Sequence, residues 1–258
     1  MSESTAPAVL AHRSEGVLVI TLNRPAVRNA VNADVARGIA AALDELDGTD
    51  ELRVGVLTGA GGTFCSGMDL VAFMGGEMPY VPGRGFGGIV QAPPRKPLIG
   101  AVEGWALAGG FELLLACDLV VAAETARFGV PEVTRGLVAG AGAAMLLAQR
   151  IPHAVALEML LTGAPITARR AADLGLVNQV TPEGGALEGA LALAATIAAN
   201  GPLAVVVSKQ IARSATDWTA AEGWARQDEL TGPVFTSEDA LEGATAFAEK
   251  RPPVWKGR

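Results

Sequence analysis

The stretch LIGAVEGWALAGGFELLLACDLVVAA, residues 98–123, decides the fold of this chain. Leu98–Val102 and Leu119–Ala123 are short apolar runs of strand length, and the apolar segment Phe111–Ala116 between them follows two glycines that favour the start of a helix. A helix between two buried strands is typical of the crossover that joins neighbouring parallel strands. We therefore expect a strand, a helix and a strand in this order.

The same alternation begins earlier in the chain. Val17–Leu22 is rich in β-branched residues and runs into a polar turn, which predicts a strand followed by a loop. Residues 33–46 carry apolar side chains at intervals of three or four, which predicts an amphipathic helix with Asn32 as its cap. Residues 54–57 predict the next buried strand, before Gly59. We therefore expect an α/β layer architecture with a mostly parallel sheet.

Two later segments follow other patterns. Residues 75–94 contain many glycines and prolines, which predicts a loop that holds a short helix at most. After Gly136 the apolar spacing becomes helical, so we expect the last third of the chain to be a helical cover or assembly region. The predicted helices span residues 143–149, 154–161, 168–173, 186–200, 203–214 and 237–249.

Composition limits the class of protein. The chain has 258 residues, 50% of them hydrophobic, so a sizeable core is available to one large domain or two small ones. A net charge of -7 and a single tyrosine argue against nucleic-acid binding, whereas a small anionic substrate needs only a few local cations. The apolar stretch 189–208 is interrupted by Asn200, Gly201 and Pro202, so we expect two helices and no membrane span. A polar start and two cysteines indicate a reducing cytoplasm.

Two glutamates are candidates for proton transfer. Glu112 is the only charged residue between Glu103 and Asp118, so burial would raise its pKa toward the range useful for general acid–base catalysis. The alternative is a glutamate in the first turn of a helix, where it complements the helix dipole. Glu132 follows Pro131, a pair that is also compatible with a simple helix start.

Backbone donors are the second candidate feature. Gly109 lies at a predicted helix start, where N–H groups point at any anion above them. In TFCSGMDL, residues 63–70, a glycine permits close approach and the N–H of Met68 is placed to donate to a ligand. Asp69 has the alternative role of a helix cap or turn residue. Cys65 has no neighbouring histidine or cation to lower its pKa, so we do not expect a nucleophile.

Other chemistries lack their residues. His12 and His153 are far apart, and no spacing of His, Cys or acidic residues resembles a metal site, so no metal is expected. No G-x-S-x-G motif is present for a serine hydrolase. Aromatic residues make up only 5% of the chain, which is little for a sugar site. Proton transfer on a small anionic thioester fits these residues better.

Four separate motifs, in order along the chain, resemble the enoyl-CoA hydratase/isomerase, or crotonase, family. They are NRPAVRNAVN at 23–32, LTGAGGTFCSGMDL at 57–70, KPLIGAVEGWALAGGFELLLACDLVVAAETARFGVPE at 96–132 and AFAEKRPPVW at 246–255. The resemblance implies a spiral of repeated ββα units followed by a C-terminal helical trimerisation region, assembled as trimers or dimers of trimers. It divides the chain into a spiral core with the CoA and catalytic site, residues 1–195, and a helical oligomerisation region, residues 196–258.

The resemblance also implies the site residues. Met68 and Gly109 match the residues whose backbone N–H groups form the family's oxyanion hole around a thioester carbonyl. Glu112 and Glu132 match the two glutamates of the family's hydratases, which hold and activate a water that adds at C3, while Glu132 exchanges the proton at C2. Coenzyme A is then part of the substrate, and no separate cofactor is implied. The implied substrate and CoA-binding residues are Arg28, Ala30, Ser66, Gly67, Asp69, Leu70, Phe247 and Lys250, of which the last two reach the CoA of a neighbouring subunit.

The implied activity is reversible addition of water to a trans-2-enoyl-CoA, giving a 3-hydroxyacyl-CoA, as in fatty-acid β-oxidation. Alternatives are a specialised acyl-CoA dehydratase of the carnitinyl-CoA type, a double-bond isomerase and a non-catalytic acyl-CoA-binding paralogue. Two departures from the family pattern affect the acyl pocket. Arg135 replaces a commonly apolar residue, and Ala139 precedes Gly140 where the family often has proline.

Overall fold

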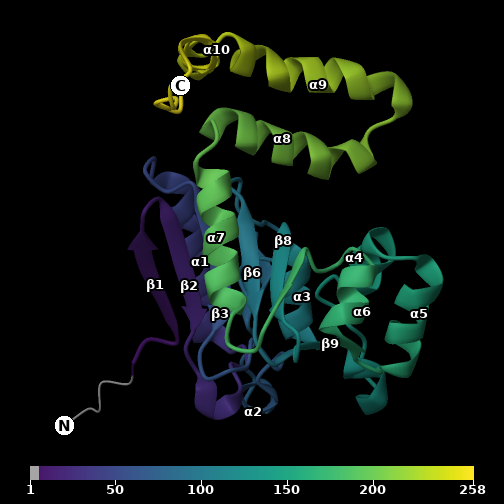
Figure 1. Ribbon diagram of the computed structural model, residues 1–258. Helices are drawn as coiled ribbons and strands as arrows, with labels where there is room; N and C mark the ends of the chain where they lie inside the picture. Colours follow the sequence, from purple (N-terminus) through teal and green to yellow (C-terminus); the bar gives the residue numbers. More distant parts are fainter. Residues whose placement is uncertain (1–5) are drawn as a thin grey trace.

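A six-stranded sheet forms the centre of the computed structural model, which describes residues 6–258 (Figure 1). The strand order is β1-β2-β3-β6-β8-β11, and all neighbours are parallel except the antiparallel pair β1 and β2 at one edge. The predicted α/β class with a mostly parallel sheet is thereby confirmed. The strands span Val9–Ser14 (β1), Val17–Leu22 (β2), Val54–Gly59 (β3), Leu98–Val102 (β6), Leu119–Ala123 (β8) and Gln179–Thr181 (β11).

A smaller sheet lies beside the large one. It contains β7 (Trp105–Leu107), β9 (Arg127–Gly129) and β10 (Ile166–Thr167), in the order β10-β9-β7. A bridge between Cys65 and Ala106 extends this row of backbone pairs by one residue. The chain therefore repeats one unit, with a strand in the large sheet, a strand in the small sheet and a helix, as in β6, β7 and α3.

The helices agree with most of the predicted ones, and Asn32 caps the first by accepting from the N–H of Val35. Two helices were not predicted, the five-residue α2 and the longer α9. α9 contains two glycines and an internal proline, and none of its residues is buried. The α-helices span Ala33–Gly48 (α1), Leu70–Met74 (α2), Gly109–Ala116 (α3), Ala143–Arg150 (α4), His153–Thr162 (α5), Ala168–Asp173 (α6), Ala186–Ala198 (α7), Pro202–Ser214 (α8), Ala220–Phe235 (α9) and Glu238–Glu249 (α10). Three short 3-10 helices span Pro25–Val27 (η1), Pro131–Arg135 (η2) and Ala215–Asp217 (η3).

The segment 75–94 is mainly loop, as predicted, and holds no helix. Within it, β4 (Tyr80–Val81) and β5 (Gly85–Phe86) form a small antiparallel hairpin that was not predicted. Each strand has two residues, which is too short for an alternating pattern to show in the sequence. Phe86 is buried, so the hairpin contributes to the core that surrounds the site.

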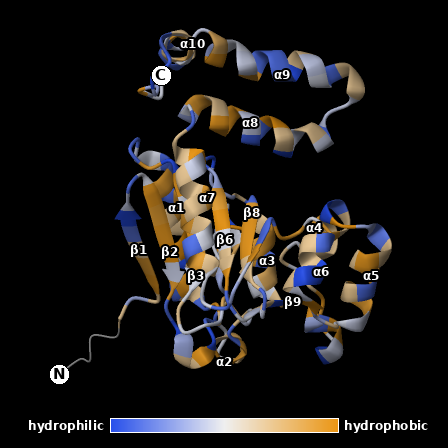
Figure 2. Cartoon of the chain, viewed as in Figure 1, coloured by the Kyte–Doolittle hydropathy of each residue, from blue (hydrophilic) through white to orange (hydrophobic). Residues whose placement is uncertain are grey.

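Apolar side chains cover both faces of the large sheet. On one face, Val56 and Ile99 pack with Ala190 and Ala194 of α7. The opposite face belongs to the main core, which includes the buried side chains of α1 and α3. Figure 2 shows the result, since the central strands are hydrophobic along their length while α9 mixes hydrophobic and hydrophilic residues. The sheet is therefore covered by apolar packing on both faces.

The C-terminal helices lie apart from the sheet. α8 crosses one end of the core, and α9 and α10 lie beyond it (Figure 1). The predicted division after residue 195 falls within the last turn of α7, and it stays a prediction. The stretch 189–208 forms two helices bent by 109°, and within residues 6–258 no single helix is long and apolar enough to cross a membrane, although this bent pair passes on length and composition alone.

Candidate active site

Two loop segments meet at the carboxyl end of β3. The N–H of Ser66 donates to the carbonyl of Arg28 over 3.0 Å, and the N–H of Val31 donates to the carbonyl of Gly67 over 2.8 Å. The N–H of Asp69 returns to the carbonyl of Val31 over 2.9 Å. These bonds bring six of the predicted residues into one small region: Arg28, Ala30, Ser66, Gly67, Asp69 and Leu70.

The segment that carries Cys65 and Gly67 also packs closely against the amino terminus of α3. The N–H of Cys65 donates to the carbonyl of Trp105 over 2.9 Å, so the segment runs beside β7. A Cβ atom on Gly110 would lie 2.4 Å from the carbonyl oxygen of Cys65, and one on Gly67 would lie 3.2 Å from the nitrogen of Gly109. Only glycine permits this approach.

Two backbone N–H groups at this contact, those of Met68 and Gly109, are available to bind a ligand. Met68 follows Gly67, and Gly109 is the first residue of α3, where an N–H has no acceptor within the helix. Across residues 6–258, neither N–H donates a hydrogen bond to another part of the protein. Ala108, immediately before α3, has φ 51° and ψ -130°, a strained conformation of the kind that concentrates at functional sites. The two donors are therefore held close together by a tight backbone crossing.

Glu112 lies one turn into α3 and is almost completely buried, with 4% of its surface exposed. Its Oε1 accepts from the N–H of Ala141 over 2.7 Å and from the N–H of Ala143 over 3.1 Å. The pKa of Glu112 is raised to about 7: burial raises it most, the charge of Glu132 adds to the rise, and the N–H donors of Ala143 and Ala141 oppose it. Glu112 is thus a buried acid that binds another segment, and not a simple first-turn glutamate.

Glu132 comes from η2, which begins at Pro131. Its Oε2 is buried and has no hydrogen-bond partner among residues 6–258. Burial also raises the pKa of Glu132, while the positive charge of Arg135 lowers it. Because the charge of Glu132 raises the pKa of Glu112, the two carboxyl groups lie within electrostatic range of each other. A buried acceptor without a partner beside a second carboxyl suits a bound water or substrate.

Two nearby residues have structural roles. Cys65 is buried, and burial raises the pKa of its thiol to about 12, which agrees with the expectation that it is no nucleophile. The carboxylate of Asp69 accepts from the N–H groups at the start of α2 and pairs with Arg24 over 2.9 Å. Although burial raises the pKa of Asp69, these hydrogen bonds and the Arg24 charge lower it overall.

Phe247 and Lys250 lie elsewhere. Both belong to the end of α10, at the opposite end of the molecule from α2 and the loop segments (Figure 1). The side chain of Phe247 is 86% exposed. Within one chain, these two residues are not brought together with the remainder of the predicted site.

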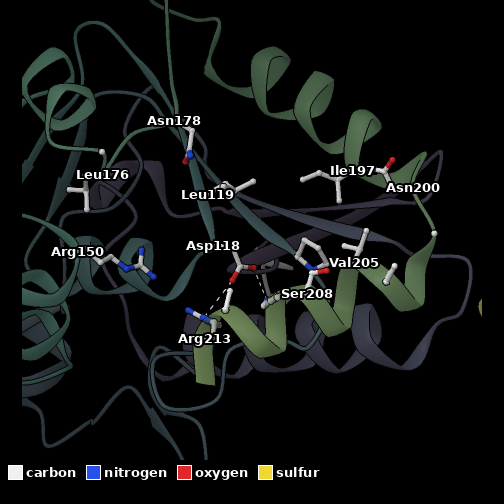
Figure 3. A pocket seen from close by; sticks show the side chains of 16 residues that line it. Asp118, Leu119, Arg150, Leu176, Asn178, Ile197, Asn200, Val205, Ser208 and Arg213 are labelled. Atoms are coloured by element: carbon white, nitrogen blue, oxygen red, sulfur yellow. Dashed lines mark ion pairs between the residues drawn. The ribbon is translucent and has the colours of Figure 1, made fainter. Parts of the chain in front are cut away.

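A separate cavity of about 710 Å³ lies between α8 and the core (Figure 3), and neither of the two glutamates lines it. Asp118 pairs there with Lys209 over 2.6 Å and with Arg213 over 3.6 Å. Arg150, from α4, lines the same cavity and donates to the carbonyl of Cys117 over 3.2 Å. The sequence analysis did not find this cluster, because its members are spread over about a hundred residues and form no motif.

The fold is α/β, and its candidate site combines two neighbouring carboxyl groups with two backbone N–H groups that have no acceptor among residues 6–258. A family model described as enoyl-CoA hydratase/isomerase matches residues 12–258, and the chain belongs to that family. It is 41% identical to an enoyl-CoA hydratase from Mycobacterium tuberculosis over 98% of this chain and 97% of that one. It is also 41% identical to a carnitinyl-CoA dehydratase from Salmonella typhi over 95% of this chain and 97% of that one.

Solved structures give the same picture. A crystal structure of an enoyl-CoA hydratase from Mycobacterium tuberculosis has a TM-score of 0.97 and 55% identity, covering 98% of this chain and 100% of that one. A carnitinyl-CoA hydratase from Mycobacterium avium has a TM-score of 0.80 and 48% identity, covering 98% of this chain and 100% of that one. The expected crotonase fold is therefore confirmed.

Proposed function

We propose that this protein is an enoyl-CoA hydratase that adds water reversibly to a trans-2-enoyl-CoA. The observation that carries the proposal is the pair of neighbouring carboxyls, from the buried Glu112 and the partly buried Glu132, in the same part of the molecule as the free N–H groups of Met68 and Gly109. Two carboxyls suit hydration because one must accept a proton while the other donates one. The relatives named as hydratases support the same reaction.

In the proposed mechanism, the N–H groups of Met68 and Gly109 bind the thioester oxygen. Glu112 takes a proton from a bound water as the water oxygen bonds to C3, and the electron pair of the double bond moves toward the thioester oxygen as an enolate. Glu132 then delivers a proton to C2, which completes the 3-hydroxyacyl thioester. A base with a pKa of about 7 is suited to this transfer near neutral pH, and each oxyanion donor contributes about 3 kcal/mol in comparable sites.

The CoA moiety is the second part of the proposal. We assign it to the loop segments that carry Arg28 and Ser66, where an exposed guanidinium is available for a phosphate. Phe247 and Lys250 would contact the CoA of a neighbouring subunit, since the end of α10, where they lie, is far from this site within its own chain. No cofactor beyond the CoA of the substrate is part of the proposal.

Assembly follows from the C-terminal helices. Large apolar side chains are exposed on α9 and α10, where subunit burial would stabilise them. We therefore propose a homo-oligomer, a trimer or a dimer of trimers, that works in the cytoplasm on fatty acyl-CoA of β-oxidation. The exposed side chains include Trp224 (72%), Phe235 (78%), Leu241 (72%) and Phe247 (86%).

A second candidate is dehydration of a carnitinyl-CoA, which the relatives with that name suggest. One feature favours the simple enoyl substrate. Arg135 follows Glu132 by three residues in a 3-10 helix, where side chains three apart are eclipsed and share one side. A positive guanidinium on the side of the reacting carboxyl repels a trimethylammonium group.

The test is turnover of two substrates by the purified protein. Loss of the conjugated enoyl-thioester absorbance on addition of crotonyl-CoA would support the hydratase, and a longer 2-enoyl-CoA would rank its chain-length preference. Gain of that absorbance from carnitinyl-CoA, at a higher kcat/KM than crotonyl-CoA hydration, would favour the second candidate. Binding of both thioesters without any turnover would overturn both activities in favour of a non-catalytic binder.

A further inference from the structure

The helices α3 and α4 are tied together at both ends. Each has eight residues and is therefore about 12 Å long. At their amino-terminal ends, Glu112 accepts from the N–H groups of Ala141 and Ala143. At their carboxyl-terminal ends, Arg150, the last residue of α4, donates to the carbonyl of Cys117, which caps α3. The two helices are thus matched in length and run in the same direction.

The contact at the carboxyl-terminal ends is made by positively charged guanidinium groups. Nη2 of Arg150 lies 3.2 Å from the Cys117 carbonyl, and Nη2 of Arg213 lies 3.2 Å from the Ala116 carbonyl. The last carbonyls of a helix carry a partial negative charge, so two guanidinium groups are favourable there. Figure 3 shows Arg150 and Arg213 near Asp118, which directly follows this helix end. Arg150 is the member that belongs to α4, the helix that continues from the segment bound by Glu112.

We propose that Arg150 is a positioning residue for Glu112: by fixing the end of α4 against the end of α3, it keeps the Ala141 and Ala143 N–H groups in register with the Glu112 carboxylate. The inference rests on the proposed function, in which Glu112 accepts a proton from water. It requires no contact between Arg150 and the substrate. The side chain acts through the helix to which it belongs.

The consequence of losing this tie has a defined direction. The N–H groups of Ala141 and Ala143 hydrogen-bond the charged form of Glu112 and so lower its pKa against the effect of burial. If α4 shifts, these bonds lengthen and the pKa of Glu112 rises. The other charged groups nearby, Glu132 and Arg135, come from η2 and are not held by Arg150. The limb of the pH–rate profile that reports Glu112 therefore moves to higher pH.

The experiment compares Arg150→Met, which keeps the bulk of the side chain, with Arg150→Lys, which keeps the positive charge. We expect Arg150→Met to lower kcat for crotonyl-CoA hydration about 10-fold, since small misplacements of catalytic groups have effects of this order. We expect KM to stay within about threefold, the pH profile to shift upward, and Arg150→Lys to recover part of both effects. Arg169→Met, on an exposed position of α6, is the matched control.

A lower Tm with unchanged kcat and an unchanged pH profile would make Arg150 merely structural and would overturn the inference. Failure of the proposed function is distinguishable. If the wild type turns over no substrate, the pH dependence of its free energy of unfolding still reports the ionisation of Glu112. In that case Arg150→Met must extend this dependence to higher pH, and no difference from the wild type would refute the positioning role.

Discussion

Replacement of Glu112 by glutamine should stabilise the protein at high pH while removing its activity. Below pH 4.5, Glu112 is protonated in both the folded and the unfolded chain, so the buried acid is neutral. As the pH rises to about 7, the unfolded chain releases this proton and the folded chain keeps it. The stability contributed by the neutral acid is therefore lost as the pH rises through the folded pKa.

The size of the effect follows from the pKa difference. A rise from 4.5 to about 7 corresponds to about 3 kcal/mol of free energy of unfolding, since one pKa unit is about 1.4 kcal/mol. Glu112→Gln keeps an oxygen to accept from Ala141 and Ala143 but cannot ionise. At pH 8 we expect it to be more stable than the wild type by up to about 3 kcal/mol, and at pH 4.5 we expect the difference to vanish.

The assay is urea unfolding at several pH values between 4.5 and 8, at one fixed protein concentration because assembly also affects stability. Glu158→Gln, on an exposed position of α5, is the control and should follow the wild type throughout. A stability difference between Glu112→Gln and the wild type that does not change with pH would refute the reasoning. Lower stability of the variant at pH 8 would do the same.

Two further substitutions test the contacts that build the site. Gly110→Ala should lower both Tm and turnover, because the new Cβ would lie 2.4 Å from the Cys65 carbonyl and widen the donor pair, whereas Gly223→Ala, with open space around it, should leave both unchanged. Turnover equal to the wild type in Gly110→Ala would contradict this. Lys209→Met should lower the free energy of unfolding by about 3 kcal/mol, because Asp118 loses its closest charged partner in a largely buried pair. A loss below about 0.5 kcal/mol in urea unfolding would place the pair with weak surface ion pairs.

Sequence patterns predicted the strands best where burial is two-sided. β2, β6 and β8 begin and end at the predicted residues, because a buried parallel strand is a continuous apolar run. β1 was not predicted, since five of its six side chains are exposed and no apolar pattern marks it. α9 was not predicted for the same reason, since none of its residues is buried and burial is what produces helical periodicity in a sequence.

The candidate active site, too, could be predicted from the sequence only in part. Glu112 could be singled out from its sequence because a lone acid in an apolar stretch is unusual. The N–H groups of Ala141 and Ala143 that bind it could not, since a backbone donor leaves no trace in the residue type. The hydrogen bond between Arg150 and the end of α3 could not be predicted either, because it joins two residues that are 33 positions apart in the chain.

The most direct test of the central claim is the rate of crotonyl-CoA hydration by the wild type, Glu112→Gln, Glu132→Gln and the double variant. If the two carboxyls act as one acid–base unit, each single variant should lose at least about 100-fold in kcat, and the double variant should lose little more than the worse single one. Full turnover in either single variant would contradict the account, because water would then be added without one of the two groups assigned to move its protons.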